Sequence, residues 1–240
     1  MLPTTSVIDT NGIRYMLFDS RDFISHIVRV TGKFELELVT ATEEVLAGKI
    51  GGVVLDIGAN MGTYTIPFAK RNPEIDVISF EPQQAIFHQL CGNVALNSLE
   101  NVTVYNVAVG GQEGTIELAM PDYMVEDNIG GFSIDPFVKS KTPTTVGKVR
   151  PVDIVTVDSL GLENVRMIKI DVEGLELDVL KGAAETIERS GFPPLIFEAW
   201  TQYDWWDAYR EELFAYVEGL GYEITSPYVN NFLAVQKETV

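Results

Sequence analysis

The 240-residue sequence contains a single cysteine, Cys91, and this scarcity limits how the chain can be stabilised. One cysteine excludes an intramolecular disulfide and a zinc site built from several cysteines. Positive charge is also scarce, because 17 lysines and arginines accompany 35 aspartates and glutamates and leave a net charge of −18. Proteins that bind nucleic acid draw affinity from clustered cations, so this composition argues against a nucleic-acid partner.

Long hydrophobic runs are missing as well. No uninterrupted apolar stretch approaches the roughly 18 residues that a membrane-spanning helix needs. The segment from Met1 to Gly12 has neither the basic start nor the apolar stretch of a secretory signal peptide. We therefore expect a soluble, cytoplasmic protein without a membrane span.

From Val53 onward, short apolar runs alternate with segments of helix length. This pattern is typical of a parallel sheet covered by helices on both faces, so it predicts an α/β fold. The expected strands are 53–57, 75–80, 102–106, a strand after Gly114, 152–157, 167–170 and 195–198. The expected helices are 63–71, 83–97, 175–189 and 204–220. Two closing strands, 222–225 and 232–235, are expected to form an antiparallel hairpin at the sheet edge.

Two regions fall outside this alternation. Residues 1–52 are expected to form an N-terminal cap before a main domain of residues 53–240. The segment 120–150 has no sustained periodicity and contains several prolines and glycines, which predicts a lid-like loop. Within the cap, we expect β-type runs that form a hairpin and then an amphipathic helix, at 6–9, 13–18, 27–30 and 34–49.

The strand 53–57 runs into a glycine-rich turn and then into a helix. Gly58 and Gly62 flank Asn60, and such a turn brings backbone N–H groups close to a ligand at the carboxyl edge of the sheet. The GxNxG spacing differs from the GxGxxG of dinucleotide-binding proteins, which disfavours a pyrophosphate. Asp56, at the end of the strand, suits a ligand that carries an amino group.

Glu81 lies at the tip of the next strand, where an acidic residue can accept hydrogen bonds from both hydroxyls of a ribose. The alternative is a surface carboxylate that caps the helix opened by Pro82. Together with the glycine turn, Glu81 favours a nucleoside ligand. Asn106 and Ala108 follow the third strand, where a polar group and small apolar side chains would suit an adenine.

Two carboxylates, Asp171 and Glu173, follow the strand 167–170. They are two positions apart, so they point to one side if the strand continues that far. Carboxylates at this end of a parallel strand face the ligand crevice and are candidates for a general base, a metal ligand or a substrate anchor. Alternatively, Glu173 begins the next helix with a favourable charge.

Five motifs together resemble the FkbM family of S-adenosylmethionine-dependent methyltransferases: VLDIGANMGTYT, FEP, NVTVYNVAVG, IKIDVEGLELDVLKGA and PLIFEAW. The glycine turn occurs in many methyltransferases, whereas KIDVEGLE is far more specific to this family. The resemblance covers about Val53 to Val235. It implies a Rossmann-like class I methyltransferase fold, with a mostly parallel seven-stranded sheet, helices on both faces and an antiparallel edge hairpin.

The resemblance also implies roles for single residues. The methionine part of S-adenosylmethionine would be held by Asp56, Gly58, Asn60 and Gly62. The remaining contacts would be Glu81 with the ribose, Asn106 and Ala108 with the adenine, and Asp171 and Glu173 with the region of the methyl group.

Four further residues are candidates for contact with the methyl acceptor. Asn128 and Ser133 belong to a segment similar to the Asn-Gly-Ser-rich stretch that the family has in this place. Glu198 ends a strand, and Trp200 begins an aromatic cluster that also contains Tyr203, Trp205, Trp206 and Tyr209. For Glu198 the alternative is a surface role, and for the aromatic cluster it is helix packing.

The sequence thus predicts an O-methyltransferase that uses S-adenosylmethionine and acts on a small molecule or glycan, such as a sugar or natural product. Asp171, with Glu173, would orient or deprotonate the acceptor hydroxyl. A divalent cation held by these two carboxylates is an alternative. The rival functions are an NAD-type oxidoreductase and a noncatalytic S-adenosylmethionine-binding module. The motifs carry no information on the oligomeric state.

Overall fold

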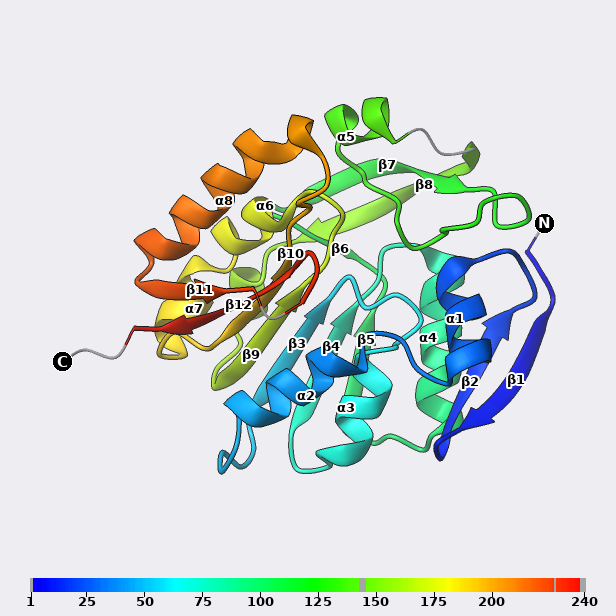
Figure 1. Ribbon diagram of the computed structural model, residues 1–240, viewed down its shortest axis with the longest axis horizontal. Helices are drawn as coiled ribbons and strands as arrows, with labels where there is room; N and C mark the ends of the chain where they lie inside the picture. Colours follow the sequence, from blue (N-terminus) through cyan, green and yellow to red (C-terminus); the bar gives the residue numbers. More distant parts are fainter. Residues whose placement is uncertain (1, 143–145, 227, 238–240) are drawn as a thin grey trace.

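The computed structural model describes residues 2–142, 146–226 and 228–237. A seven-stranded sheet forms its centre (Figure 1). In spatial order the sheet contains β11 (Tyr222–Thr225), β12 (Asn231–Gln236), β10 (Leu195–Glu198), β9 (Val165–Ile170), β3 (Val53–Ile57), β4 (Asp76–Phe80) and β5 (Val102–Tyr105). Neighbouring strands from β10 to β5 run parallel, and β12 is antiparallel to both β10 and β11. The predicted mostly parallel sheet with an antiparallel edge hairpin is therefore confirmed.

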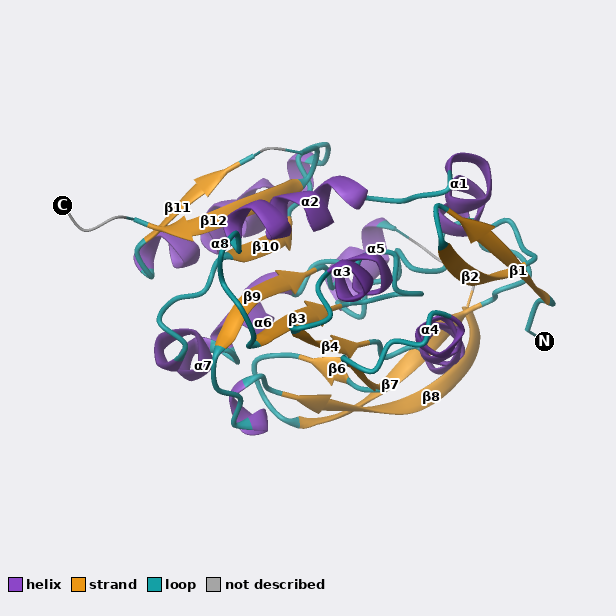
Figure 2. Cartoon of the chain, turned by 90° about the horizontal axis from the view of Figure 1, so that it is seen from below, coloured by secondary structure: helices purple, strands orange, loops and turns teal. Residues whose placement is uncertain are grey.

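Helices cover both faces of this sheet, as predicted, and Figure 2 shows α2 and α7 on opposite sides of β9. Successive strand residues point to opposite faces, so Val54 packs with one set of helices and Leu55 with the other. The first set contains α2 (Leu36–Val45) and α3 (Thr65–Arg71); the second contains α6 (Glu176–Lys181), α7 (Ala184–Arg189) and α8 (Asp207–Gly219). Among the described residues, no helix is both long and apolar enough to cross a bilayer.

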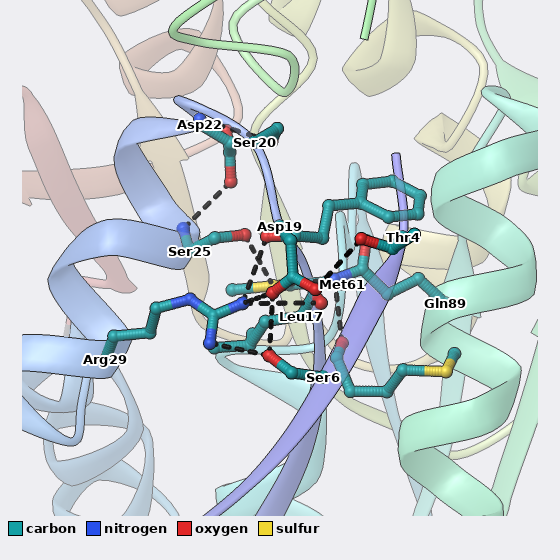
Figure 3. A network of polar contacts seen from close by, with 12 residues as sticks. Thr4, Ser6, Leu17, Asp19, Ser20, Asp22, Ser25, Arg29, Met61 and Gln89 are labelled. Atoms are coloured by element: carbon teal, nitrogen blue, oxygen red, sulfur yellow. Dashed lines mark hydrogen bonds and ion pairs between the residues drawn. The ribbon is translucent and has the colours of Figure 1, made fainter. Parts of the chain in front are cut away.

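The N-terminal hairpin consists of β1 (Thr5–Thr10) and β2 (Ile13–Phe18), and it is followed by α1 (Phe23–Thr31). The prediction of a strand at 27–30 is wrong, because these residues lie in α1. Asp22 caps this helix by accepting a hydrogen bond of 2.8 Å from the backbone N–H of Ser25 (Figure 3). The cap outweighs the β preference of a short run rich in branched side chains.

The hairpin and α1 pack against α4 (Gln84–Leu96), the helix that follows Glu81. Gln89 of α4 donates a hydrogen bond of 2.8 Å to the carbonyl of Met16 in β2. Asn93 accepts one of 2.6 Å from the N–H of Met16 and donates one of 2.8 Å to the carbonyl of Met61. These bonds connect the N-terminal hairpin to α4, and they connect α4 to the glycine turn at the edge of the sheet.

The segment 120–150, predicted as an irregular loop, is partly regular. Its two ends belong to a second sheet, which consists of β6 (Ala108–Val109), β7 (Gly114–Pro121) and β8 (Val146–Val155). Between these ends the segment contains a short helix, α5 (Pro136–Lys141). Ile129, Phe132 and Val138 are buried and anchor the segment. They lie singly among glycines and prolines, so no periodicity marks them in the sequence. Residues 143–145 of the predicted lid lie outside the described residues.

Candidate active site

A cavity lies at the carboxyl edge of β3, β4 and β9, where the sequence predicts the ligand. The glycine turn, the segment around residues 128–134 and the turn after β9 form its wall. The predicted site residues that line it are Gly58, Asn60, Glu81, Ala108, Asn128, Asp171, Glu173 and Glu198. Parallel strands bring these residues together because their carboxyl ends meet at one edge.

Gly58 brings two strand ends into direct contact. Its φ is +83°, and a Cβ at this position would lie 1.7 Å from the carbonyl oxygen of Asp171. The backbone N–H of Asp171 also donates a hydrogen bond of 2.9 Å to Ile57. Any side chain at Gly58 would push the two segments apart, so glycine is required for Asp171 to lie beside the turn.

Glu81 lines the cavity, and its side chain is buried. One carboxylate oxygen accepts a hydrogen bond of 3.0 Å from the N–H of Asn60, and the other accepts one of 2.8 Å from Gln83. Burial raises the pKa of Glu81 to about 7, although these two bonds oppose the rise. The side chain of Asn106 donates a hydrogen bond of 2.8 Å to the backbone carbonyl of Glu81. Asn106 therefore holds the end of the strand in place but does not line the cavity.

Asp56, predicted to contact the methionine amino group, lies behind the cavity wall. Its side chain is fully buried, accepts a hydrogen bond of 2.5 Å from Thr65 and lies 3.3 Å from the Nζ of Lys169. Lys169 also lies 3.2 Å from Asp171. Burial opposes the charge of Lys169, but Asp171, Asp56 and Glu35 raise its pKa above the ordinary value. Asp56 therefore pairs with Lys169, which does line the cavity, and does not line the cavity itself.

Lys169 is not among the site residues predicted from the sequence. The register places it directly opposite Asp56 on the neighbouring strand, and it shares a strand face with Met167 and Asp171 because side chains alternate. A lysine inside an otherwise apolar strand could have indicated a buried ion pair, because a charged residue is rarely buried without a partner.

Three carboxylates that line the cavity lie close to one another. One oxygen each of Asp171, Glu173 and Glu198 lies within 4.8 Å of the others. Burial first, and then the neighbouring carboxylates, raise the pKa of Glu173 and of Glu198 well above the ordinary value. Such an arrangement can accept a proton from a hydroxyl, hydrogen-bond that hydroxyl, or coordinate a divalent cation.

Two further residues hold these carboxylates in place. The carboxylate of Glu176 accepts hydrogen bonds of 3.2 Å and 3.1 Å from the N–H groups of Val172 and Gly174, which fixes the turn that carries Glu173. Because α6 begins at Glu176, Glu173 lies before the helix, and the alternative that it begins the helix is wrong. Trp200 donates a hydrogen bond of 3.0 Å to Glu198.

The aromatic cluster packs as a hydrophobic unit. Trp200 and Trp206 are buried with Val138 of α5, and none of the cluster's aromatic residues lines the cavity. Trp200 thus touches Glu198 but does not lie in the predicted acceptor position. Ser133 and Gly62 are also outside the wall: the Ser133 hydroxyl accepts a hydrogen bond of 3.1 Å from Asp135, and Gly62 is buried behind the turn.

Glu35 lines the cavity, although the sequence predicts only an amphipathic helix over 34–49 and no site residue there. It precedes α2 with φ +49°, a left-handed conformation that costs a residue other than glycine roughly 1–2 kcal/mol. Burial and the nearby Asp171 raise the pKa of Glu35 to about 7, and Lys169 opposes the rise. The sequence gives no sign of this position, because the packing of α2 on the sheet brings it to the cavity.

We expect the unliganded protein to be more stable in mild acid than in mild base. Burial raises the pKa of Glu81 and of Glu176 from 4.5 to about 7. Between these values the folded state binds more protons than the unfolded state, so stability falls as pH rises. Each of the two carboxyls contributes about 2 kcal/mol over this range, so urea denaturation should show a loss on the order of 4 kcal/mol between about pH 5.5 and about pH 8.

A matched pair of variants tests this pH dependence. Glu176→Gln should reduce the slope, whereas Glu100→Gln, at an exposed position, should leave it unchanged. Stability that increases with pH over the same range would contradict the assigned burial of these carboxylates.

Comparison with known proteins shows similarity to methyltransferases. Residues 56–224 match the family described as the methyltransferase FkbM domain. Methyltransferase sdnD of Sordaria araneosa is 25% identical over 203 residues, which cover 72% of this chain and 74% of sdnD. The 2-O-methyltransferase NoeI of Sinorhizobium fredii is 26% identical, with 58% of this chain and 60% of NoeI covered.

Methyltransferase 1 of Beauveria bassiana is 28% identical, and the match covers 54% of this chain and 57% of that protein. The chain thus spans less than two thirds of the length of two of these relatives. Among solved structures, the precorrin-6y C5,15-methyltransferase from Geobacter metallireducens aligns with a TM-score of 0.50 and 13% identity, covering 84% of this chain and 88% of the other. This likeness supports the Rossmann-like class I fold.

Proposed function

The chain belongs to the FkbM methyltransferase family, and from this premise we propose that it transfers a methyl group from S-adenosylmethionine to a hydroxyl oxygen of a small-molecule or glycan acceptor. The observation that carries the proposal is a single cavity lined from both sides of β3. Glu81 and Ala108 follow β4 and β5 on one side, whereas Asp171 and Glu173 follow β9 and Glu198 ends β10 on the other side. Similarity to a 2-O-methyltransferase favours oxygen as the acceptor atom.

The cavity lining fits S-adenosylmethionine. Glu81 offers two carboxylate oxygens to a ribose, and small or apolar side chains, among them Ala108 and Leu118, border the space for an adenine. The glycine turn connects Lys169 and Glu81, because the carbonyl of Gly58 accepts a hydrogen bond of 3.5 Å from Lys169 and the N–H of Asn60 donates one of 3.0 Å to Glu81. When bound, S-adenosylmethionine supplies a methyl group that is activated by its positively charged sulfur.

The protein's own contribution is to align the acceptor and to remove its proton. In this proposal Asp171 accepts the hydroxyl proton, and Lys169, 3.2 Å away, fixes the position of its carboxylate. Glu173 and Glu198 hydrogen-bond the acceptor. Phe23, Phe34, Phe132 and Ile134 form apolar parts of the wall and would exclude water once the acceptor is bound.

Carboxylates outnumber cations around the acceptor end. Lys169 is the one lysine or arginine among the described residues that line the cavity, and it already pairs with Asp56 and Asp171. Phosphorylated acceptors and nucleic acids would meet like charge there, so we propose an uncharged or cationic hydroxyl compound.

Isothermal titration calorimetry with S-adenosylhomocysteine and NAD, side by side, tests the proposal. We expect S-adenosylhomocysteine to bind at about micromolar concentration and NAD not to bind. Release of S-adenosylhomocysteine in a screen of hydroxylated sugars and natural products would then identify an acceptor. Binding of NAD without binding of S-adenosylhomocysteine would overturn the proposal, and cofactor binding without turnover on any acceptor would favour a noncatalytic module.

Glu81→Ala should weaken S-adenosylhomocysteine binding roughly tenfold or more, since charge-assisted hydrogen bonds are each worth about 1.5–3 kcal/mol. The change also leaves the N–H groups of Asn60 and Gln83 without their acceptor. Glu81→Gln keeps one oxygen and should lose less. Calorimetry on these variants and on the exposed control Glu74→Gln measures the effect, and unchanged affinity in Glu81→Ala would remove Glu81 from the ribose site.

A further inference from the structure

Glu35 brings a carboxylate to the cavity from outside the region that matches the family, which begins at residue 56. The helix α2 that follows it packs on the sheet face of Val54 and Met167. Asp56, Lys169 and Asp171 belong to this same face by strand alternation. Glu35 is therefore positioned over the charged end of β3 and β9.

The charges at this point are unbalanced. Lys169 lies within 3.3 Å of both Asp56 and Asp171, so one ammonium group serves two carboxylates. Glu35 adds a third carboxylate, whose oxygens make no hydrogen bond and no ion pair within 4.0 Å with the residues of 2–142, 146–226 and 228–237, although the more distant charge of Lys169 favours its ionised form. A half-buried carboxylate without a partner, beside other carboxylates, is stabilised when a ligand brings a positive charge.

One part of the proposed cofactor carries a positive charge together with hydrogen-bond donors, namely the α-ammonium group of its methionine moiety. In the proposed function the ribose contacts Glu81, and the acceptor contacts Glu173 and Glu198. Neither of these contacts explains why a carboxylate without a hydrogen-bond partner lies at Glu35. We propose that Glu35 receives the α-ammonium group and so orients the methionine end of the cofactor. This inference rests on the proposed function, and it replaces the direct contact that the sequence predicts for Asp56.

The test compares two ligands that differ in the amino-acid part. S-adenosylhomocysteine contains the ammonium group, whereas 5′-methylthioadenosine contains the same nucleoside thioether without it. Glu35→Gln, which keeps the size of the side chain, should weaken S-adenosylhomocysteine binding by about tenfold or more and change 5′-methylthioadenosine binding by less than about twofold. Calorimetry measures both dissociation constants.

Two other variants serve as references. Glu37→Gln removes an exposed carboxylate from the same helix and should change neither affinity. Glu81→Ala should weaken both ligands to a similar extent, because both contain the ribose. Thermal unfolding of each variant confirms that it is folded before its affinity is compared.

The outcomes separate this inference from the proposed function. If the wild-type protein does not bind S-adenosylhomocysteine, the proposed function fails, and this inference fails with it. If the wild type binds but Glu35→Gln weakens neither ligand, or weakens both equally, the assignment of Glu35 to the ammonium group is overturned while the proposed function stands. A selective loss for S-adenosylhomocysteine supports it.

Discussion

Replacing Lys169 with methionine is expected to lower the free energy of unfolding by about 3–5 kcal/mol, as found when one partner of a buried ion pair is removed. Lys169 and Asp56 are both buried, and their charged atoms lie 3.3 Å apart. Without Lys169, the Asp56 carboxylate is left with Thr65 as its remaining hydrogen-bond donor among the described residues. Urea denaturation monitored by circular dichroism measures the loss.

A double variant and a surface control make this prediction specific. Lys169→Met combined with Asp56→Asn should recover much of the lost stability, because the fully buried charge of Asp56 is then removed together with its partner, and only the partly exposed Asp171 remains unpaired. Lys181→Met removes an exposed lysine that lies 3.6 Å from Glu212. Exposed pairs contribute little, so this control should change stability by less than about 1 kcal/mol. A similarly small effect of Lys169→Met would show that the buried pair is not needed for folding.

Replacing Asp171 with asparagine should reduce turnover by about 10² or more while the affinity for S-adenosylhomocysteine changes little. Asparagine has nearly the same shape but cannot accept the hydroxyl proton. Asp171 lies between Lys169 and the other two carboxylates of the acceptor end, so the charge is lost where the acceptor oxygen would be. Steady-state kinetics with an acceptor found in the screen, together with calorimetry, separate turnover from binding.

A chelator distinguishes the two possible roles of Asp171. If the oxygens of Asp171, Glu173 and Glu198 hold a divalent cation, removing the cation from the wild type should abolish turnover. If Asp171 is a general base, the chelator should have no effect. Full turnover in Asp171→Asn would move the proton transfer to Glu198 or another residue, and loss of cofactor binding would assign Asp171 to the nucleoside pocket.

The strands that form the site were predictable from local sequence. The expected strands 53–57, 75–80 and 167–170 correspond to Val53–Ile57, Asp76–Phe80 and Val165–Ile170. Buried parallel strands are short, continuous apolar runs, and the glycine turn is specified by neighbouring residues. Once the strands are parallel, their carboxyl ends meet, so the position of Glu81, Asp171 and Glu198 at one cavity follows from the sequence.

Errors arose where a local pattern was short or absent. Residues 27–30 resemble a strand, but the cap at Asp22 and packing on α4 stabilise a helix there. The segment 120–150 lacks a period, yet Ile129, Phe132 and Val138 each fill a separate place in the hydrophobic packing. An isolated apolar residue is not part of a periodic pattern, so the sequence does not predict its burial. Whether it is buried depends on the elements that it packs against in the folded protein.

The sequence by itself determined the fold class, the glycine turn and the carboxylates at the strand ends, because each depends on residues close together in the chain. The tertiary structure alone decided which charges pair and which line the cavity. Asp56 and Lys169 meet through the register of two strands far apart in sequence, and this pair keeps Asp56 away from the cavity. Glu35 reaches the cavity because α2 packs on one face of the sheet. Both effects arise from contacts between distant segments, which no local pattern of residue types specifies.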